Sequence, residues 1–343
     1  MAVQDIAYVE LYTKNKVTAV DYFVSAMGFT RVADSVEVDR SSVLLRQGDV
    51  QLVITSGQGI GKFLDEFGDG VADIAMTCDD VAATREAAVK AGARPVGFAE
   101  DRSAVSAFGG VRHSLLPSTG TAEHRLPPGR RWVATPSEPV GPAGPAARIR
   151  LLDHIAVCLE GGSLAECADF YQNAFAFSRY SSEYVALGGQ AMDSIVVRSA
   201  SGRVTFTLVA PDPTKNPGQL DAFLERNGGA GVQHLAFLVD DIIPAVHEFR
   251  ERGVEFLSTP GTYYDLLLER FPEMWDQITE LLAAQVLADR DEWGHLLQLF
   301  SRSPYERNTL FFELIQRQGS RGFGSANIRA LYEAVERDRL TAR

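Results

Sequence analysis

The chain has 343 residues, 45% of them hydrophobic and 23% charged, and a formal net charge of −12; this size favours two globular domains of roughly 150 residues each. The acidic balance, without a cluster of Lys and Arg among aromatic residues, argues against nucleic acid as a partner, and no apolar run approaches the roughly 18 residues of a membrane span. Three cysteines are too few for a disulfide framework and the first residues lack the order of a secretory signal, so we expect a soluble, cytoplasmic protein.

The first predicted domain, residues 1–116, contains two repeats of one pattern. A short apolar strand, IAYVEL (6–11), precedes an amphipathic helix that Gly28 ends, and VLLRQGDVQLVIT (43–55) alternates like a β-hairpin around a glycine turn. The pattern restarts with FLDEFGDGVADIAMTCDDV (63–81) and a helix that stops at the glycine of AGARPV. Each repeat therefore predicts a strand, a helix and further strands.

The segment 117–149 is rich in proline and glycine, as in LPPGRR and PSEPVGPAGPAA. Such a composition cannot sustain a helix or a central strand, so we interpret the segment as a linker. Trp132 and Val133 are apolar, and they indicate that part of this linker packs on the protein surface.

The second predicted domain, residues 150–343, follows the same plan as the first. LDHIAV (152–157) answers the first strand, Ala176 closes the next helix, and IVVRSASGRVTFTLVAP (195–211) forms the second hairpin. FLERNGGAGVQHLAFLVDDI (223–242) restarts the pattern, and NIRALYEAVERDRL has the apolar spacing of a terminal amphipathic helix. The fold class is α+β: two domains of tandem βαβββ modules, each an open, barrel-like sheet with outer helices, plus a C-terminal helix.

Two histidines occupy equivalent strand positions in the second domain, His154 in LDHIAV and His234 in VQHLAF. Modules related by a pseudo-twofold axis would bring these strands side by side, so the two imidazoles could share one metal ion. The equivalent residues of the first domain are Tyr8 and Asp73, which predicts that this domain has no metal site.

The third metal ligand is predicted to be Glu313, in the apolar strand TLFFELIQR (309–317). An ionised carboxylate buried among Phe and Leu is unfavourable unless it is paired or binds a metal. Two histidines and one carboxylate form a facial triad that leaves three positions open, enough for a bidentate 2-oxo acid and dioxygen.

Less specific interpretations of these residues stay open. A single histidine on a strand is more often a hydrogen-bonded core residue than a ligand, and Glu313 could face solvent on an edge strand. The symmetric pair of histidines together with the strand glutamate favours the metal site. The remaining histidines have polar neighbours and are expected to be solvated: His113, His124, His247 and His295.

Over nearly its whole length the chain resembles the family of 4-hydroxyphenylpyruvate dioxygenase and 4-hydroxymandelate synthase, within the vicinal oxygen chelate superfamily. The most specific stretches are GGAGVQHLAF, GVEFLSTPGTYYDLL, VLADRDEWGHLLQLF and TLFFELIQRQGSRGFGSANIRALYEAVER. The resemblance implies an iron(II) enzyme with His154, His234 and Glu313 as the iron ligands. It also implies a substrate pocket formed by Ser194, Thr207, Gln219, Gln298, Phe312, Phe323, Asn327 and Ile328.

The resemblance further implies oxidative decarboxylation of a 4-hydroxyphenylpyruvate-like 2-oxo acid by dioxygen. The dioxygenase then hydroxylates the ring to give homogentisate, whereas the synthase hydroxylates the benzylic carbon to give 4-hydroxymandelate. Where the ring-hydroxylating pattern has Pro-x-Asn this chain has TLV (207–209), and where that pattern has Gly-Asn-Phe it has ANI (326–328). Both departures favour benzylic hydroxylation, although neutral drift in a ring-hydroxylating enzyme would also produce them.

Two rival functions are compatible with the same layout. An extradiol dioxygenase would use a catechol and further acid and base residues, and a metal-free binding protein would take up no iron. The tail RQGSRGFGSANI argues against the first, and retention of three ligand residues argues against the second. We also expect a homo-oligomer, either a dimer or a tetramer, and a C-terminal helix that acts as a lid hinged at residues 319–324.

Overall fold

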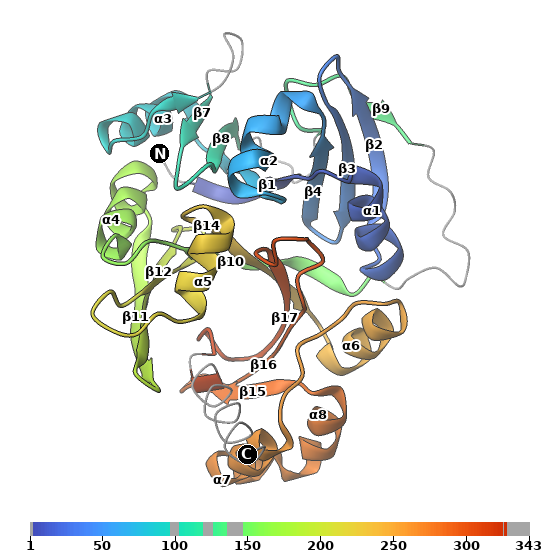
Figure 1. Ribbon diagram of the computed structural model, residues 1–343, viewed down its shortest axis with the longest axis vertical. Coiled ribbons are helices and arrows are strands. Elements are labelled where there is room, and N and C mark those ends of the chain that lie inside the picture. Colours follow the sequence, from blue (N-terminus) through green and yellow to red (C-terminus); the bar gives the residue numbers. More distant parts are fainter. Residues whose placement is uncertain (1–2, 97–102, 119–125, 136–146, 325, 328–343) are drawn as a thin grey trace.

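Two strongly curled sheets, one from each half of the chain, form the molecule (Figure 1). The computed structural model describes residues 3–96, 103–118, 126–135, 147–324 and 326–327. Within these ranges the N-terminal sheet has the strand order β6-β7-β8-β5-β1-β4-β3-β2-β9, and the C-terminal sheet has the order β11-β12-β13-β10-β14-β17-β16-β15. None of the helices in the described ranges is long and apolar enough to cross a bilayer.

The N-terminal half contains two βαβββ modules joined by the antiparallel pair β1 and β5. The first module consists of β1 (Val3–Tyr12), α1 (Lys16–Asp21) with the π-helix η1 (Tyr22–Ala26), β2 (Thr30–Val36), β3 (Ser41–Gln47) and β4 (Val50–Ser56). After η2 (Gln58–Ile60) and α2 (Gly61–Phe67), the second module consists of β5 (Gly70–Cys78), α3 (Val81–Lys90), β6 (Pro95–Val96), β7 (Ala104–Ser106) and β8 (Arg112–Pro117).

The C-terminal half repeats this arrangement around the antiparallel pair β10 and β14. Its first module consists of β10 (Ile149–Cys158), α4 (Leu164–Phe175), β11 (Ser178–Leu187), β12 (Gln190–Arg198) and β13 (Thr205–Pro211). After α5 (Gln219–Asn227), the second consists of β14 (Gly231–Val239), α6 (Ile242–Glu251), α7 (Gly261–Arg270), η3 (Pro272–Gln277), α8 (Ile278–Ala284), β15 (Leu287–Arg290), β16 (His295–Phe300) and β17 (Phe311–Gln318). The predicted α+β fold of tandem βαβββ modules is confirmed.

Local sequence signals end the helices where the pattern predicted. Gly28 follows η1 with a φ of 77°, and Ala176 closes α4 in the left-handed conformation with a φ of 57°. A residue with a side chain is disfavoured there by roughly 1 kcal/mol, so packing of the adjacent Phe175 and Phe177, both buried, holds this turn.

The predicted linker is only partly separate from the sheets. Its residues Val133–Ala134 form β9, an edge strand paired with β2. Arg130 reaches the interior of the N-terminal sheet and forms an ion pair with buried Glu10 at 2.5 Å. Trp132 packs against the small cluster around Tyr8, in agreement with its apolar character.

Two of the contacts between the halves lie at pseudo-equivalent places. On β17, Phe312 packs against η1 of the other half, with its ring 5.3 Å from that of Phe23. On β8, His113 packs against α4, with its ring 5.7 Å from that of Tyr171. The expectation that His113 is solvated is wrong, because its side chain is fully buried between the two halves.

Candidate metal centre

Three neighbouring strands bring the predicted ligands together inside the curl of the C-terminal sheet. His154 lies on β10, His234 on β14 and Glu313 on β17. In the register, His154 pairs with Ala236, and Ala236 pairs on its other side with Glu313. Paired residues and residues two apart point to the same face of a sheet. All three side chains therefore point to the concave face.

The three donor atoms are close enough to share one ion. The Nε2 atoms of His154 and His234 are 3.4 Å apart, and they lie 3.3 Å and 3.2 Å from Oε2 of Glu313. Ligand bonds of about 2.1 Å place neighbouring donors about 3.0 to 3.4 Å apart for octahedral to tetrahedral angles. The triad is buried, with side-chain exposures of 3%, 12% and 2%.

Hydrogen bonds at the outer nitrogens orient both imidazoles. Nδ1 of His154 lies 2.9 Å from a carboxylate oxygen of Asp153, and Nδ1 of His234 lies 3.2 Å from Oε1 of Gln233. Because those oxygens can only accept, each Nδ1 donates, and Nε2 is the atom of each ring that faces the shared centre. A metal ligand needs this orientation.

The electrostatics of the triad favour a cation. Burial opposes the charged form of Glu313, but His154 and His234 offset it and lower the pKa of this carboxyl below its usual value. Burial also disfavours a charged His154, yet Glu313 and Asp153 raise its pKa to about 9. For His234 burial prevails and lowers the pKa. The carboxylates of Asp153 and Glu313 thus lie on either side of the His154 ring, and Glu313 also contacts His234.

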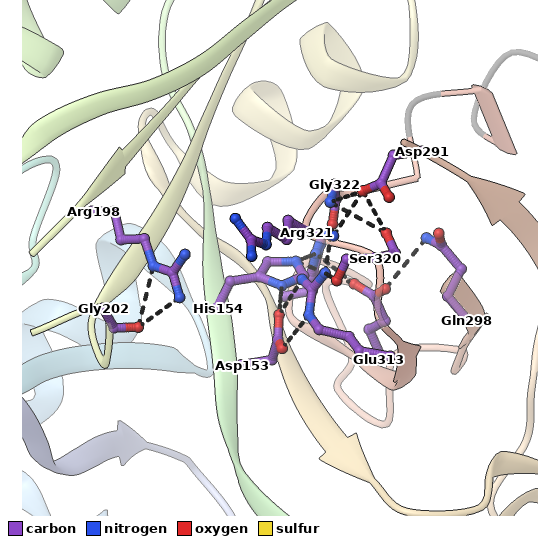
Figure 2. A network of polar contacts seen from close by, with 12 residues as sticks. Asp153, His154, Arg198, Gly202, Asp291, Gln298, Glu313, Ser320, Arg321 and Gly322 are labelled. Atoms are coloured by element: carbon purple, nitrogen blue, oxygen red, sulfur yellow. Dashed lines mark hydrogen bonds and ion pairs between the residues drawn. The ribbon is translucent and has the colours of Figure 1, made fainter. Parts of the chain in front are cut away.

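Gln298 and Asn327, both predicted pocket residues, form a hydrogen-bonded chain that starts at the triad. Figure 2 shows its first contact, between Gln298 and Glu313. Gln298 donates to Oε1 of Glu313 at 3.3 Å and accepts from Asn327 at 3.1 Å. Tyr263 on α7 donates in turn to Oδ1 of Asn327 at 2.7 Å. Gln298, Asn327 and Tyr263 are buried.

Phe323 also lies at the triad. Its ring is 5.2 Å from the imidazole of His154, at an interplanar angle of 90°. Tyr180 on β11 contacts the same ring at 6.2 Å. Phe323 therefore forms an apolar wall beside one of the ligands.

Thr207 and Ser194 face the same concave side as the triad. Thr207 on β13 pairs with Ala156 on β10, and Ala156 pairs on its other side with His234 on β14. Ser194 precedes by two residues Val196, the partner of Thr207 on β12. Thr207 is buried and Ser194 is half-buried.

Three of the predicted pocket residues are not brought to the triad by the described structure. Phe312 is next to Glu313 on β17 and therefore points to the opposite face, where it packs against the N-terminal half. Gln219 is exposed at the start of α5 and lines a surface pocket with Met192. Ile328 lies outside the described residues.

Sequence reasoning missed several residues that contact the triad, namely Asp153, Gln233, Phe300 and Phe311, and also Arg317, which contacts Asp153. Asp153 and Arg317 form a bidentate ion pair behind His154, with N–O distances of 2.7 Å. Phe311 stacks on the ring of His234 at 5.0 Å, and Phe300 contacts it edge-on at 5.9 Å. The signal for Asp153 was its position beside His154, while the two phenylalanines follow from Glu313 once the strand register is known.

The equivalent place in the N-terminal sheet is filled by ion pairs. Glu10 pairs in register with Asp73, and both carboxylates are fully buried. Arg112 forms ion pairs with Asp73 at 2.8 Å and with Glu10 at 3.5 Å, and Arg130 completes the cluster. Ser114 donates to Asp73 at the position that corresponds to Glu313. Among the described residues, the triad of the C-terminal sheet is the one cluster with metal-ligand spacing.

Comparison with known proteins shows which protein family the chain belongs to. The profile of the family "Hydroxyphenylpyruvate dioxygenase, HPPD, N-terminal" matches residues 1–116, and that of the "Glyoxalase/Bleomycin resistance protein/Dioxygenase superfamily" matches residues 151–299. The 4-hydroxyphenylpyruvate dioxygenase of Aspergillus fumigatus is 30% identical over 96% of this chain and 91% of its own. The enzyme of that name from Neurospora crassa is 33% identical over 81% of this chain and 71% of its own.

Solved structures agree in fold over almost the whole chain. A triple mutant of 4-hydroxymandelate synthase from Streptomyces coelicolor is 48% identical and superposes with a TM-score of 0.86, covering 98% of this chain and 99% of the other. A fusion protein of a xylose isomerase-like TIM barrel and a 4-hydroxyphenylpyruvate dioxygenase is 26% identical, with a TM-score of 0.78 and coverage of 98% and 53%.

The fold and the triad define the class, which is a dioxygenase of the vicinal oxygen chelate fold. Within that class the chain belongs to the family of 4-hydroxyphenylpyruvate dioxygenase and 4-hydroxymandelate synthase, which are non-haem iron enzymes. Enzymes of this family act on a 2-oxo acid with dioxygen.

Proposed function

We propose that the protein converts 4-hydroxyphenylpyruvate and dioxygen into 4-hydroxymandelate and carbon dioxide with iron(II) held by His154, His234 and Glu313. The equation balances, because one oxygen atom enters the new carboxylate and the other enters the benzylic hydroxyl group. The observation that carries the proposal is the buried cluster of two Nε2 atoms and one carboxylate oxygen, all within 4.8 Å of one another.

The donor set fits iron(II). Two imidazoles and one carboxylate on one side of an ion are the ligands of many non-haem iron oxygenases. Bound iron(II) would supply open positions for the 2-oxo acid and dioxygen, together with the electrons that begin the splitting of the O–O bond. The buried carboxylate of Glu313, with Nε2 of both histidines beside it, supports binding of a divalent cation.

The residues around the triad would orient the substrate and exclude water. Glu313 is anchored by Gln298, so its second oxygen stays directed at the shared centre. Phe323 and Phe311 enclose the imidazoles with apolar rings, which suits an aromatic substrate. A closed, apolar surround also protects reactive states from water.

Similarity to the synthase supports benzylic over ring hydroxylation. The solved synthase is 48% identical to this chain, whereas the dioxygenases from A. fumigatus and N. crassa are 30% and 33% identical. Thr207, at a departure from the ring-hydroxylating pattern, faces the triad side of β13. Since the outcome depends on which carbon lies in a near-attack position, a change of pocket wall of about 1 Å can redirect it.

Homogentisate formation is the second candidate, because the curated relatives quoted above are dioxygenases by name. The two products are isomers, so mass alone does not separate them. The test is to incubate the protein with iron(II), dioxygen and 4-hydroxyphenylpyruvate and to record proton NMR of the product. 4-Hydroxymandelate shows a benzylic CH and a para-substituted ring, whereas homogentisate shows a CH2 and a ring with three substituents.

A variant pair tests the ligand set in the same assay. Glu313→Gln is expected to abolish both iron uptake and product formation because it removes the anionic ligand. Glu306→Gln is the matched control, since the Glu306 side chain is 83% exposed. Cleavage of catechols without turnover of 4-hydroxyphenylpyruvate, or wild-type iron uptake by Glu313→Gln, would contradict the proposal.

A further inference from the structure

Arg317 connects the metal centre to the segment that follows β17. The residue lies near the end of β17, four positions after Glu313, and its side chain is 19% exposed. Its Nε and Nη2 atoms donate to the two carboxylate oxygens of Asp153, each at 2.7 Å. Asp153 in turn accepts from Nδ1 of His154 at 2.9 Å. One guanidinium thus fixes the carboxylate that orients a metal ligand.

The remaining nitrogen of Arg317 holds the segment 319–324. Nη1 donates to the backbone carbonyl of Ser320 at 3.2 Å and to that of Gly322 at 2.7 Å. The face of the guanidinium lies 5.2 Å from the ring of Phe323, which itself contacts His154. The side chain of Arg317 therefore contacts both Asp153, beside the metal centre, and the segment 319–324.

Asp291 holds the segment from its other side (Figure 2). Its Oδ2 accepts from the backbone N–H groups of Arg321 and Gly322, at 2.7 Å and 2.8 Å, and from the hydroxyl of Ser320 at 2.8 Å. The segment is thus held between the carboxylate of Asp291, on the β15–β16 turn, and the guanidinium of Arg317. We call this arrangement the closed state of the segment. The amides of Arg321 and Gly322 report on whether it stays closed.

A lysine could not replace this arrangement. A guanidinium offers a planar fork of N–H donors that matches a carboxylate, with further donors left for other acceptors, whereas an ammonium is a single point of charge. Removing the groups that orient a metal-binding histidine typically lowers the metal affinity about 10- to 100-fold.

On this basis, and resting on the proposed metal site, we propose that Arg317 is a positioning residue that couples metal binding at His154 to closure of segment 319–324. Metal binding fixes the His154 ring, which aligns Asp153 and Arg317, and this alignment favours the closed segment that carries Phe323. Coupling between two sites is reciprocal, so loss of Arg317 weakens metal binding and also removes the effect of the metal on the segment.

The test uses the full chain, freed of metal, with Co(II) as the probe and without substrate. Calorimetry gives the Kd for Co(II), and hydrogen exchange gives the protection of the Arg321 and Gly322 amides with and without Co(II). In the wild type, Co(II) is expected to slow exchange of both amides. In Arg317→Met the Kd is expected to rise about 10- to 100-fold, and Co(II) should no longer slow that exchange.

Arg302→Met is the matched control, because Arg302 is 58% exposed and lies 3.9 Å from its partner Glu255. It should behave like the wild type in both measurements. A folded Arg317→Met variant with an unchanged Kd, or with exchange that is faster by the same factor with and without Co(II), would mean a merely structural role and would overturn the inference.

Asp153→Asn keeps the inference testable if Arg317→Met does not fold. This substitution keeps the shape of Asp153 while removing the charge that pairs with Arg317, and it should weaken Co(II) binding and coupling in the same direction. A wild-type Kd in Asp153→Asn refutes the inference. A protein that shows the coupling but makes no 4-hydroxymandelate refutes only the proposed function, since neither measurement involves turnover.

Discussion

Acidification is expected to weaken the contact between the two halves through His113. Its Nδ1 donates to the carbonyl of Ile74 at 3.0 Å, and its Nε2 accepts from the hydroxyl of Tyr171 at 2.9 Å. Phe175 and Phe206 contact the ring from other directions. A proton on Nε2 would displace the hydroxyl hydrogen of Tyr171 from this contact, and burial lowers the pKa of His113 from 6.5 to about 4.

The size of the effect follows from that shift in pKa. Between pH 6.5 and pH 4 the unfolded chain binds more protons at His113 than the folded chain does, so the free energy of unfolding falls as the pH is lowered. At 1.36 kcal/mol per pKa unit, the contribution of His113 is reduced by about 2 kcal/mol at pH 5 and about 3 kcal/mol at pH 4. The full contribution is present above pH 6.5 and is lost toward pH 4.

Urea unfolding of the wild type and of His113→Asn across pH 7 to pH 4.5 isolates this contribution. The stability difference between the two proteins should shrink by about 2 kcal/mol between pH 7 and pH 5, because other groups titrate alike in both. His247→Asn, on the exposed side of α6, is the matched control. A pH-independent difference between wild type and His113→Asn would refute the reasoning.

Three further substitutions separate metal binding from folding. Gln298→Leu removes the amide that holds Glu313, and calorimetry should show an affinity for Co(II) about 10-fold lower. Arg112→Met leaves Asp73 buried without its ion pair, so urea unfolding should show a loss of about 3–5 kcal/mol, while unchanged stability would argue against a charged Asp73. Phe312→Ala should lower the free energy of unfolding by about 3–5 kcal/mol but leave Co(II) affinity unchanged, and weakened affinity would place the ring at the site after all.

The triad was predictable because independent sequence signals converged on it. His154 and His234 stood at repeat-related positions, and Glu313 was an acidic residue in an otherwise apolar strand. Because burial of an unpaired carboxylate is strongly unfavourable, its position in an apolar strand already indicated a cationic partner. The repeat also predicted the four βαβββ modules, since each module has its own helix stop and hairpin turn.

Neighbours of the triad were harder to predict, since their roles depend on register and on distant pairing. Phe312 was expected in the pocket, but side chains alternate along a strand, and an inward Glu313 turns its neighbour outward. By the same alternation, His113 points to the opposite face from Ser114 and is buried between the two halves. Its position near the linker along the chain did not indicate this burial. The partner of Asp153 lies 164 residues away, at Arg317, and no local pattern indicates that pairing.

Alternation along β17 also means that the N-terminal half, whose described residues form no metal-ligand cluster, supports the half that contains the triad. Glu313 and Phe312 are consecutive, so the strand offers a donor to the cation on one side and an aromatic anchor to Phe23 and Tyr22 on the other. A C-terminal half produced alone would expose that anchor and lose the support behind its acidic ligand. The N-terminal half thus supports the strand that carries Glu313, and the C-terminal half depends on that contact.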